Sequence, residues 1–224
     1  MKAAPSSKKT KAPGGEPFLP ELRTLPSLRA ASQDCRGCDL YRHATQAVFG
    51  EGPLTATLFV IGEQPGNDED RQGHPFVGPA GRILDKALAE AQIDRSEVYV
   101  TNTVKHFKFE ERGKRRIHQK PNAAEVRACS PWLEAEIRLI RPKVILCLGA
   151  TAAQSLLGRS FRLTQHRGES MPHAWAPSVV ATTHPSAILR APDEEQRHEE
   201  YRKLVADLMK VRSLLDQPTL KQSA

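Results

Sequence analysis

Short apolar runs that alternate with helical patterns place the strongest constraint on how this chain folds. Four runs are read as strands, at residues 57–62, 98–102, 143–150 and 178–185. Uninterrupted apolar runs of this length are typical of strands that are buried on both faces of a sheet. Because helical segments separate the runs, we expect a three-layer α/β/α fold around a central, mainly parallel four-stranded sheet.

The intervening segments show helical spacing of their apolar residues. We predict a short helix after residue 150 and longer helices at 80–93, 122–140 and 193–215. Asn122 is a suitable N-cap for the second long helix, and Pro131 inside it predicts a kink or a break. The last helix carries acidic residues early and basic residues late, as the helix dipole favours.

Composition predicts one domain with a tail at each end. A chain of 224 residues is long enough to bury one sizeable core. We expect a single domain over 21–215, a disordered basic tail over 1–20 and a flexible tail over 216–224, because these ends are poor in apolar residues. The chain shows neither a secretory signal nor a membrane-spanning run, so we expect a cytoplasmic protein. We also expect it to act as a monomer.

Positive charge is concentrated in two segments. Residues 105–120 hold seven Lys or Arg against two Glu, and residues 1–20 hold four Lys against one Glu, within a total charge of +7. The remainder is therefore nearly neutral. A basic segment on a neutral body is expected for a nucleic-acid-binding protein, although for residues 1–20 alone solvated surface charge is the preferred interpretation.

Polar side chains with chemical potential follow three of the predicted strands. In parallel α/β sheets the ligand binds beyond the carboxyl ends of the strands, which here selects residues 62–79, 102–121, 149–151 and 184–190. Glu63 follows the first strand, Asn102 closes the second, and His184 ends the fourth. Each residue also has a structural explanation, as part of a surface loop, a turn or a helix cap. Phe76 is either a packing residue or a stacking platform.

The run "KRRIHQK" places a histidine, His118, among four cations. These cations are Lys114, Arg115, Arg116 and Lys120. Such a run typically binds phosphates, and from the loop alone a phosphate contact is also the preferred role for the histidine. An imidazole can in addition act as a base, an acid or a nucleophile.

The four cysteines are unevenly spaced. Cys35 and Cys38 form a CxxC pair, Cys129 lies on a predicted helix, and Cys147 lies inside a predicted strand. Zinc sites usually show two compact pairs, so the scattered set suits an iron–sulfur cluster better than zinc. A CxxC without metal plus two buried thiols explains the pattern equally well.

Taken together, the motifs resemble the uracil-DNA glycosylase superfamily, and within it the iron–sulfur branch typified by family 4. The resemblance covers residues 30–212. Two departures, Gln64 in place of the usual Ala and the long basic insertion, resemble the UdgX group. The motifs that carry the resemblance are, in order, the CxxC pair, Gly62-Glu63-Gln64-Pro65-Gly66, Pro75-Phe76-Val77-Gly78, the two later cysteines and His184-Pro185-Ser186.

The resemblance implies excision of uracil from DNA, with single strands preferred because a stacked base must first be exposed. Phe76 would stack on uracil, and Asn102 would pair with its N3/O4 edge and so reject cytosine. His184 would stabilise the departing uracil anion, and Glu63 would stabilise the sugar cation or act as base. It further implies that Gln64 contacts uracil, that Ser186 and the four loop cations contact the DNA backbone, and that a 4Fe-4S cluster is held by Cys35, Cys38, Cys129 and Cys147.

The likeness to UdgX implies a covalent outcome, in which His118 bonds to the sugar C1′ and the enzyme turns over once. We expect the neighbouring Arg115, Arg116 and Lys120 to lower the pKa of His118 and keep it neutral. Loss of the other ring proton, for example to Glu63, would make the adduct neutral. The alternatives are a conventional turnover glycosylase and a non-catalytic iron–sulfur protein that binds nucleic acid.

Overall fold

A five-stranded sheet forms the centre of the computed structural model, which describes residues 13–218. The strand order is β2-β1-β5-β7-β6, and all neighbours are parallel except β7 and β6. The expected three-layer, mainly parallel fold is confirmed, with one strand more than the four expected. The strands are β1 (Leu58–Gly62), β2 (Val98–Asn102), β5 (Val144–Leu148), β6 (Ser170–His173) and β7 (Ala176–Thr182).

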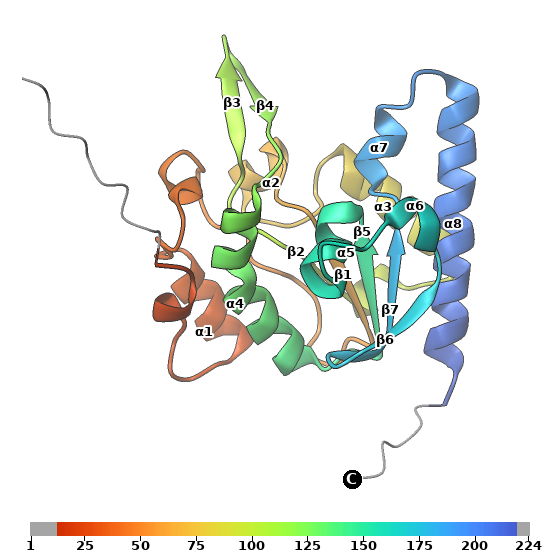
Figure 1. Ribbon diagram of the computed structural model, residues 1–224, viewed down its shortest axis with the longest axis horizontal. Helices are drawn as coiled ribbons and strands as arrows, with labels where there is room; N and C mark the ends of the chain where they lie inside the picture. The colour runs from red at the N-terminus through yellow and green to blue at the C-terminus, as the bar shows by residue number, and fades with distance from the viewer. Residues whose placement is uncertain (1–12, 219–224) are drawn as a thin grey trace, which may run out of the picture.

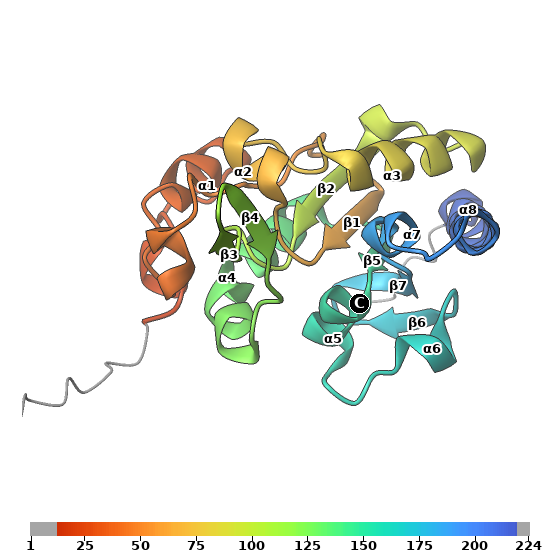
Figure 2. The same ribbon diagram turned by 90° about the horizontal axis from the view of Figure 1, so that it is seen from above.

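Helices cover both faces of this sheet (Figures 1 and 2). Helices α3 and α8 pack together on one face, and α4 and α5 cover the other, with α1 outside α4. The α-helices are α1 (Leu25–Ser32), α2 (Asn67–Gln72), α3 (Pro79–Glu90), α4 (Ala123–Ile140), α5 (Ala150–Leu157), α6 (Leu163–His166), α7 (Pro185–Leu189) and α8 (Glu194–Asp216). Single 3-10 turns are η1 (Glu16–Phe18), η2 (Asp39–Arg42) and η3 (Arg95–Glu97).

The core has two halves because alternate strand residues point to opposite faces. In β1, Leu58 and Val60 face α3 and α8, whereas Phe59 and Ile61 face α4 and α5. Every residue of β1, β2 and β5 is buried, which explains their continuous apolar runs. The edge strand β6 has no such run, because its residues alternate between exposed and half-buried, and no local pattern marked it as a strand.

The long helix α4 tests two local predictions. Asn122 is its N-cap, and its side-chain oxygen accepts hydrogen bonds from the backbone N–H groups of Ala124 and Glu125. Pro131 does not break the helix, which continues to Ile140. The proline ring leaves the carbonyl of Arg127 without its usual helical donor, and the hydroxyl of Ser130 donates to that carbonyl at 3.1 Å instead.

The chain already packs on the body before residue 21. The N–H of Gly15 donates to the carbonyl of Ala128 in α4 at 2.7 Å, and a Cβ at Gly15 would lie 2.8 Å from the indole nitrogen of Trp132. Residues 13–20 therefore do not behave as the predicted tail, because glycine allows this close approach. The rest of the two predicted tails, 1–12 and 219–224, lies outside the described residues, and α8 continues to Asp216.

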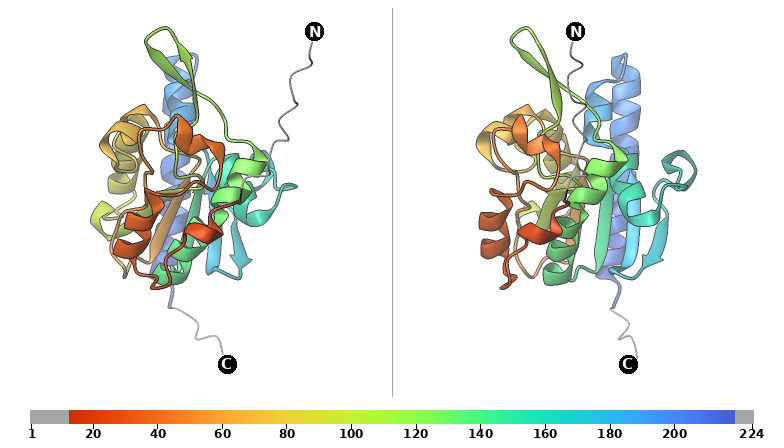
Figure 3. Two further views of the ribbon diagram at one scale, coloured as in Figure 1. Left: turned by 90° about the vertical axis from the view of Figure 1, so that its left-hand side faces the viewer. Right: turned by 60° about the vertical axis from the view of Figure 1, so that its left-hand side comes forward.

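The basic segment forms a hairpin that projects from the carboxyl edge of the sheet (Figures 1 and 3). Its strands, β3 (Phe109–Arg112) and β4 (Arg115–His118), are antiparallel, and Gly113 supplies the positive φ of +61° at the turn. The register pairs Phe109 with His118. Within residues 13–218, every helix is too short or too polar to span a bilayer.

Candidate active site

Four strand ends meet where the chain reverses its direction of strand addition. From β1 the chain adds β2 on one side, and it then crosses to add β5 and β7 on the other side. Such a switch point is where α/β sheets bind ligands. Glu63 follows β1, Asn102 ends β2, Thr151 opens α5 after β5, and His184 follows β7, so the rule brings the predicted residues to one edge.

A carboxylate and an imidazole face each other at this edge. The Nε2 atom of His118 lies 3.5 Å from the Oε1 atom of Glu63, and the two side chains are 51% and 21% exposed. The hydroxyl of Thr151 donates to the other oxygen of Glu63. The site is therefore open to solvent at His118. The carboxylate of Glu63 is more enclosed, and its position is fixed by the hydroxyl of Thr151.

Gln64 holds the base of the hairpin, which differs from its predicted contact with uracil. Its amide nitrogen donates to the carbonyls of Lys108 and Gln119, each at 3.1 Å, and its amide oxygen accepts from the N–H of Lys108, also at 3.1 Å. The side chain is buried. All three bonds hold the two ends of the hairpin together. Both hydrogen bonds from the amide nitrogen therefore go to the backbone of the protein.

Arg116 is also turned inward, although it was predicted to contact DNA. One of its terminal nitrogens lies 2.6 Å from a carboxylate oxygen of Asp70, which is fully buried, and its Nε donates to the side chain of Asn67 at 2.9 Å. The guanidinium also lies over the rings of Phe107 and Phe109. This residue therefore anchors β4 to α2, and a buried ion pair of this kind is costly to break from one side.

The remaining cations of the run are available to a ligand. Lys114, Arg115 and Lys120 are all exposed. Lys114 and Arg115 lie at the turn and the start of β4, and Lys120 follows the end of β4. The structure thus divides the predicted phosphate-binding set into one anchoring residue and three surface residues.

His184 is fixed by the first turn of α7. The N–H of Ser186 donates to its Nδ1 atom at 3.1 Å, and the Ser186 hydroxyl lies 2.8 Å from the same atom. An N–H group can only donate, so Nδ1 is an acceptor and the neutral ring carries its proton on Nε2. Burial, with Arg190 and His118 nearby, lowers the pKa of His184 to about 4. Ser186, predicted to bind the DNA backbone, positions this imidazole.

Phe76 lies close to both His184 and Asn102. The rings of Phe76 and His184 are stacked with their centroids 6.3 Å apart. A Cβ at Gly62 would lie 2.3 Å from the Asn102 side-chain oxygen and 2.8 Å from the Phe76 ring. Glycine at this position thus lets the amide of Asn102 and the ring of Phe76 approach each other. Phe76 itself has a positive φ of 60°, a backbone conformation uncommon for a non-glycine residue.

The pKa of His118 is lowered, as expected, but for a different reason. Burial is the main cause, and Arg190 adds to the effect, while the carboxylate of Glu63 acts in the opposite direction. The loop cations predicted to lower this pKa are not among its causes, and one of them, Arg116, is paired with Asp70. The shift towards the neutral imidazole comes from the site around His118 and not from the basic run.

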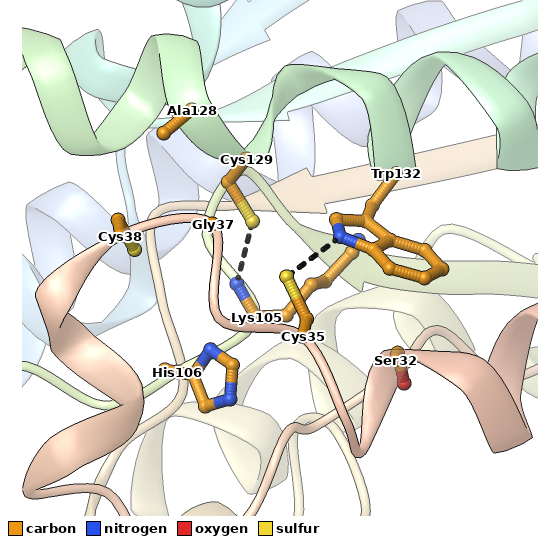
Figure 4. Close-up of a pocket in the computed structure, with 9 residues that line it drawn as sticks. All are labelled: Ser32, Cys35, Gly37, Cys38, Lys105, His106, Ala128, Cys129 and Trp132. Carbon is orange, nitrogen blue, oxygen red and sulfur yellow. Dashed lines mark hydrogen bonds between the residues drawn. The ribbon is translucent and has the colours of Figure 1, made fainter. Parts of the chain in front are cut away.

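Three of the four cysteines meet in a separate cavity (Figure 4). Each sulfur accepts an N–H group: Cys35 from the indole of Trp132 at 3.2 Å, Cys129 from the backbone of Lys105 at 3.3 Å, and Cys38 from the backbone of Leu40. Burial raises the pKa of Cys129 to about 12, so a proton leaves this thiol readily only when a cation replaces it. His106 also lines this cavity.

The structure does not bring Cys147, the predicted fourth ligand, to this cavity. It lies in the middle of the sheet, paired with Ile61 on β1 and Ala181 on β7, and it is fully buried among apolar side chains. Burial alone raises its pKa to about 12, and no N–H group from the described residues lowers it. Its strand position makes it a core residue.

No three His, Cys, Asp or Glu side chains within residues 13–218 are arranged to hold a single metal ion. The cavity thus lacks a preformed mononuclear site such as zinc requires, where four ligands surround one ion. In an iron–sulfur cluster the ligands bind different irons, so they stand farther apart. The donor set of the cavity, with three hydrogen-bonded sulfurs, remains compatible with a cluster.

Sequence reasoning missed three contributors to these sites. Thr151 lies in the segment selected by the strand-end rule, but no chemical motif marked it. Asp70 is one acid among several in its segment, and only the fold shows that it is buried. His106 shares no ligand spacing with the CxxC pair in the sequence, and only the fold brings it to the cavity.

The fold and the site define an α/β protein that presents a carboxylate and two imidazoles at a sheet switch point. A family model described as the uracil DNA glycosylase superfamily matches residues 49–209. The chain is 37% identical over 197 residues to a type-4 uracil-DNA glycosylase of Thermotoga maritima, which covers 87% of this chain and 95% of that protein. A type-4 uracil-DNA glycosylase of Archaeoglobus fulgidus is 34% identical over 194 residues, covering 84% and 94%.

A type-5 uracil-DNA glycosylase of Pyrobaculum aerophilum is more distant, at 28% identity over 182 residues, 73% of this chain and 76% of that protein. The family match spans more than half of the chain, and the two type-4 proteins align over nearly their whole length. The chain therefore belongs to the uracil-DNA glycosylase superfamily.

Proposed function

We propose that this protein excises uracil from DNA and then becomes covalently attached to the sugar through His118. The glycosylase activity is supported by the type-4 relatives and by the strand-end residues. The covalent step rests on one observation, the 3.5 Å between His118 Nε2 and Glu63 Oε1. This distance puts an imidazole nitrogen beside the carboxylate that would face the reacting sugar.

Uracil would enter the space between Phe76, Asn102 and His184. The phenyl ring offers a stacking surface, which any base accepts. The amide of Asn102 offers a donor and an acceptor to the N3/O4 edge of uracil, and cytosine presents the reverse pattern. Because the Nδ1 atom of His184 already accepts a bond, its Nε2–H is free to donate to uracil O2.

Bond cleavage would leave its electron pair on uracil and a cation-like sugar at C1′. The Nε2–H of His184 stabilises the uracil anion in a partly buried place, where such a hydrogen bond is stronger than in water. Glu63 stabilises the sugar cation by its negative charge. The hydroxyl of Thr151 fixes the carboxylate, so the charge need not reorganise during the reaction.

Capture of C1′ would then be a competition between water and His118. The Nε2 lone pair forms the new N–C1′ bond, which requires the tautomer with its proton on Nδ1. That proton leaves afterwards to solvent, and the adduct becomes a neutral N-alkyl imidazole, a poor leaving group. A nucleophile held beside C1′ has a large effective molarity over water.

The hairpin supports this role because it is anchored rather than loose. Gln64 binds both of its ends, and Arg116 is paired with a buried carboxylate. The two features that set this chain apart from ordinary family 4, Gln64 and the basic insertion, are therefore parts of one structural unit. Its effect is to fix the position of His118.

We propose that DNA binds across the carboxyl edge of the sheet, with single strands preferred. The exposed Lys114, Arg115 and Lys120 would neutralise phosphates without reading sequence. We propose that the protein acts as a monomer.

We further propose that Cys35, Cys38 and Cys129 hold a 4Fe-4S cluster. The hydrogen bonds to their sulfurs favour thiolates, and such bonds are usual around iron–sulfur clusters. The cluster would supply a structural cross-link between the segment containing Cys35 and Cys38 and helix α4. No step of the proposed reaction passes through it.

The deciding experiment compares wild-type protein with His118→Ser on a uracil-containing single strand, with uracil release and a denaturing gel read from the same samples. We expect a shifted band that survives heat and SDS for the wild type. For His118→Ser we expect released uracil, abasic DNA and no such band, because water replaces the imidazole.

Other outcomes identify the alternatives. Uracil release without any shifted band in the wild type would indicate a conventional turnover glycosylase. Retained DNA binding with no uracil release, unchanged by Glu63→Gln and His184→Ala, would indicate a non-catalytic binding protein. A shifted band with His118→Ser would mean that another residue is the nucleophile.

A further inference from the structure

We propose that His106, not Cys147, is the fourth ligand of the iron–sulfur cluster. This inference rests on the cluster proposed above and specifies the ligand set of that same cavity. It predicts a cluster held by three thiolates and one imidazole.

The position of His106 is the first argument. Its ring lines the cavity together with Cys35, Cys38 and Cys129, and in Figure 4 it lies on the side of the cavity opposite Cys129. The four side chains come from three separate segments: the loop before η2, the loop after β2 and helix α4. The ring thus supplies a fourth donor, a nitrogen, where three sulfurs converge.

The burial of His106 without a partner is the second argument. The residue is only 5% exposed, and neither ring nitrogen has a hydrogen-bond partner within residues 13–218. The ring nitrogens are not sealed off by protein, since the fully buried side-chain nitrogen without a partner within these residues belongs to Arg167. With the ring on the cavity lining, they are left open to a ligand in the cavity. A metal bound to one nitrogen would satisfy this ring.

The residue before His106 fixes the loop that carries it. The Nζ atom of Lys105 lies 2.5 Å from an oxygen of Glu136 and donates to the carbonyl of Asn102 at 2.9 Å, and both charged side chains are fully buried. The backbone N–H of Lys105 donates to Cys129. Lys105 is therefore bound to α4 through both its side chain and its backbone. These contacts fix the loop that carries His106 without any ligand.

Cys147 has none of these properties. It belongs to the apolar core beneath α4 and α5, and its neighbours across the sheet are Ile61 and Ala181. To reach the cavity it would have to leave the centre of β5. The number of cysteines therefore matches a four-cysteine cluster only by coincidence.

An imidazole ligand changes the charge of the cluster. A neutral nitrogen in place of a thiolate removes one negative charge, and replacement of cysteine by histidine is known to raise the reduction potential of iron–sulfur centres. We therefore expect a cluster that is easier to reduce than its all-cysteine counterpart. His106→Cys should restore a four-thiolate set and lower the midpoint potential.

The first experiment measures iron and acid-labile sulfide per chain in anaerobically purified protein. We expect wild type, His106→Cys and Cys147→Ala to retain the full complement, and His106→Ala to lose more than half of it. Cys147→Ala is the matched control, since it removes the only other cysteine. Circular dichroism checks the fold of each variant.

The second experiment detects the nitrogen directly. The reduced cluster is studied by pulsed electron paramagnetic resonance in protein labelled with ¹⁵N-histidine. We expect a strongly coupled nitrogen that changes with the label and disappears in His106→Cys. This readout does not depend on whether His106→Ala remains folded.

Two results would overturn the inference, and each differs from a failure of the cluster proposal. Loss of iron in Cys147→Ala with retention in His106→Ala would return the role to the cysteine. Absence of a coupled histidine nitrogen in an iron-loaded wild type would exclude the imidazole. Colourless wild-type protein without iron or sulfide would instead refute the cluster, and with it this deduction.

Discussion

Replacing Gln64 with alanine should separate uracil excision from covalent capture. In the structure the hydrogen bonds of this side chain go to neither Glu63 nor His118 but to both ends of the β3–β4 hairpin. The change Gln64→Ala therefore leaves every proposed reacting group in place. It removes only the connection that holds the hairpin base closed.

The size of the effect follows from three hydrogen bonds, each 3.1 Å long. A bond of this kind contributes about 1 kcal/mol net, so the docked hairpin loses about 3 kcal/mol. The carbonyl of Lys108 keeps its bond from the N–H of Gln119, which limits the loss. Since 1.4 kcal/mol corresponds to a factor of ten, adduct formation should slow by about 10- to 100-fold.

The assay is a single-turnover time course on uracil-containing single-stranded DNA, with released uracil and the SDS-stable band quantified separately. At saturating DNA we expect the rate of uracil release to change by less than about threefold, because Glu63, Asn102 and His184, which are proposed to act in this step, lie outside the hairpin. Gln154→Ala is the control, since the Gln154 amide nitrogen also donates to a backbone carbonyl at 3.1 Å, that of Phe161, but in a segment separate from the hairpin and from its anchor on α2. Its adduct yield should stay close to that of the wild type.

Two results would refute this reasoning. If Gln64→Ala forms the adduct at the wild-type rate, the amide does not position His118. If release and capture slow by the same factor, the side chain acts on the site as a whole, as the original prediction of a uracil contact implied.

Two further predictions concern Glu63 and His118. Thr151→Val keeps the shape of the side chain but removes the donor to Glu63, and a hydrogen bond to a charged group contributes about 1.5–3 kcal/mol; uracil release should slow by about tenfold or more, and an unchanged rate would contradict the role of this hydroxyl. Because burial lowers the pKa of His118, the neutral ring should persist as the pH falls below about 6.5. The capture rate, measured at a series of pH values, should therefore decline only at more acidic pH, and half-loss at or above pH 6.5 would oppose this prediction.

The sequence by itself determined the layers, four strands of the sheet and the residues at their ends. These features depend on local pattern. A run buried on both faces is continuously apolar, and the carboxyl end of a parallel strand is a fixed place relative to its neighbours. Glu63, Asn102 and His184 could therefore be assigned to one edge, and Asn122 to a helix cap, without knowledge of any tertiary contact.

The tertiary structure alone decided which polar side chains turn inward. Arg116 and Lys114 look equivalent in the sequence, but only Arg116 meets Asp70, which is 46 residues away. Gln64 meets Gln119 across 55 residues, and Thr151 meets Glu63 across 88. Contacts over such separations leave no local pattern, because they depend on how the strands and loops are arranged around the sheet.

The cysteines show the same division. Their number and the CxxC spacing left a metal site and a metal-free pair equally open, and only the resemblance to the iron–sulfur branch implied a cluster. The spacing of the cysteines in the sequence does not show that Cys147, on β5, lies in the apolar core under α4 and α5, or that His106 lines the cavity. Strand periodicity determines the face on which a residue lies, but only the packing of α4 against the loop after β2 determines which donors share one cavity.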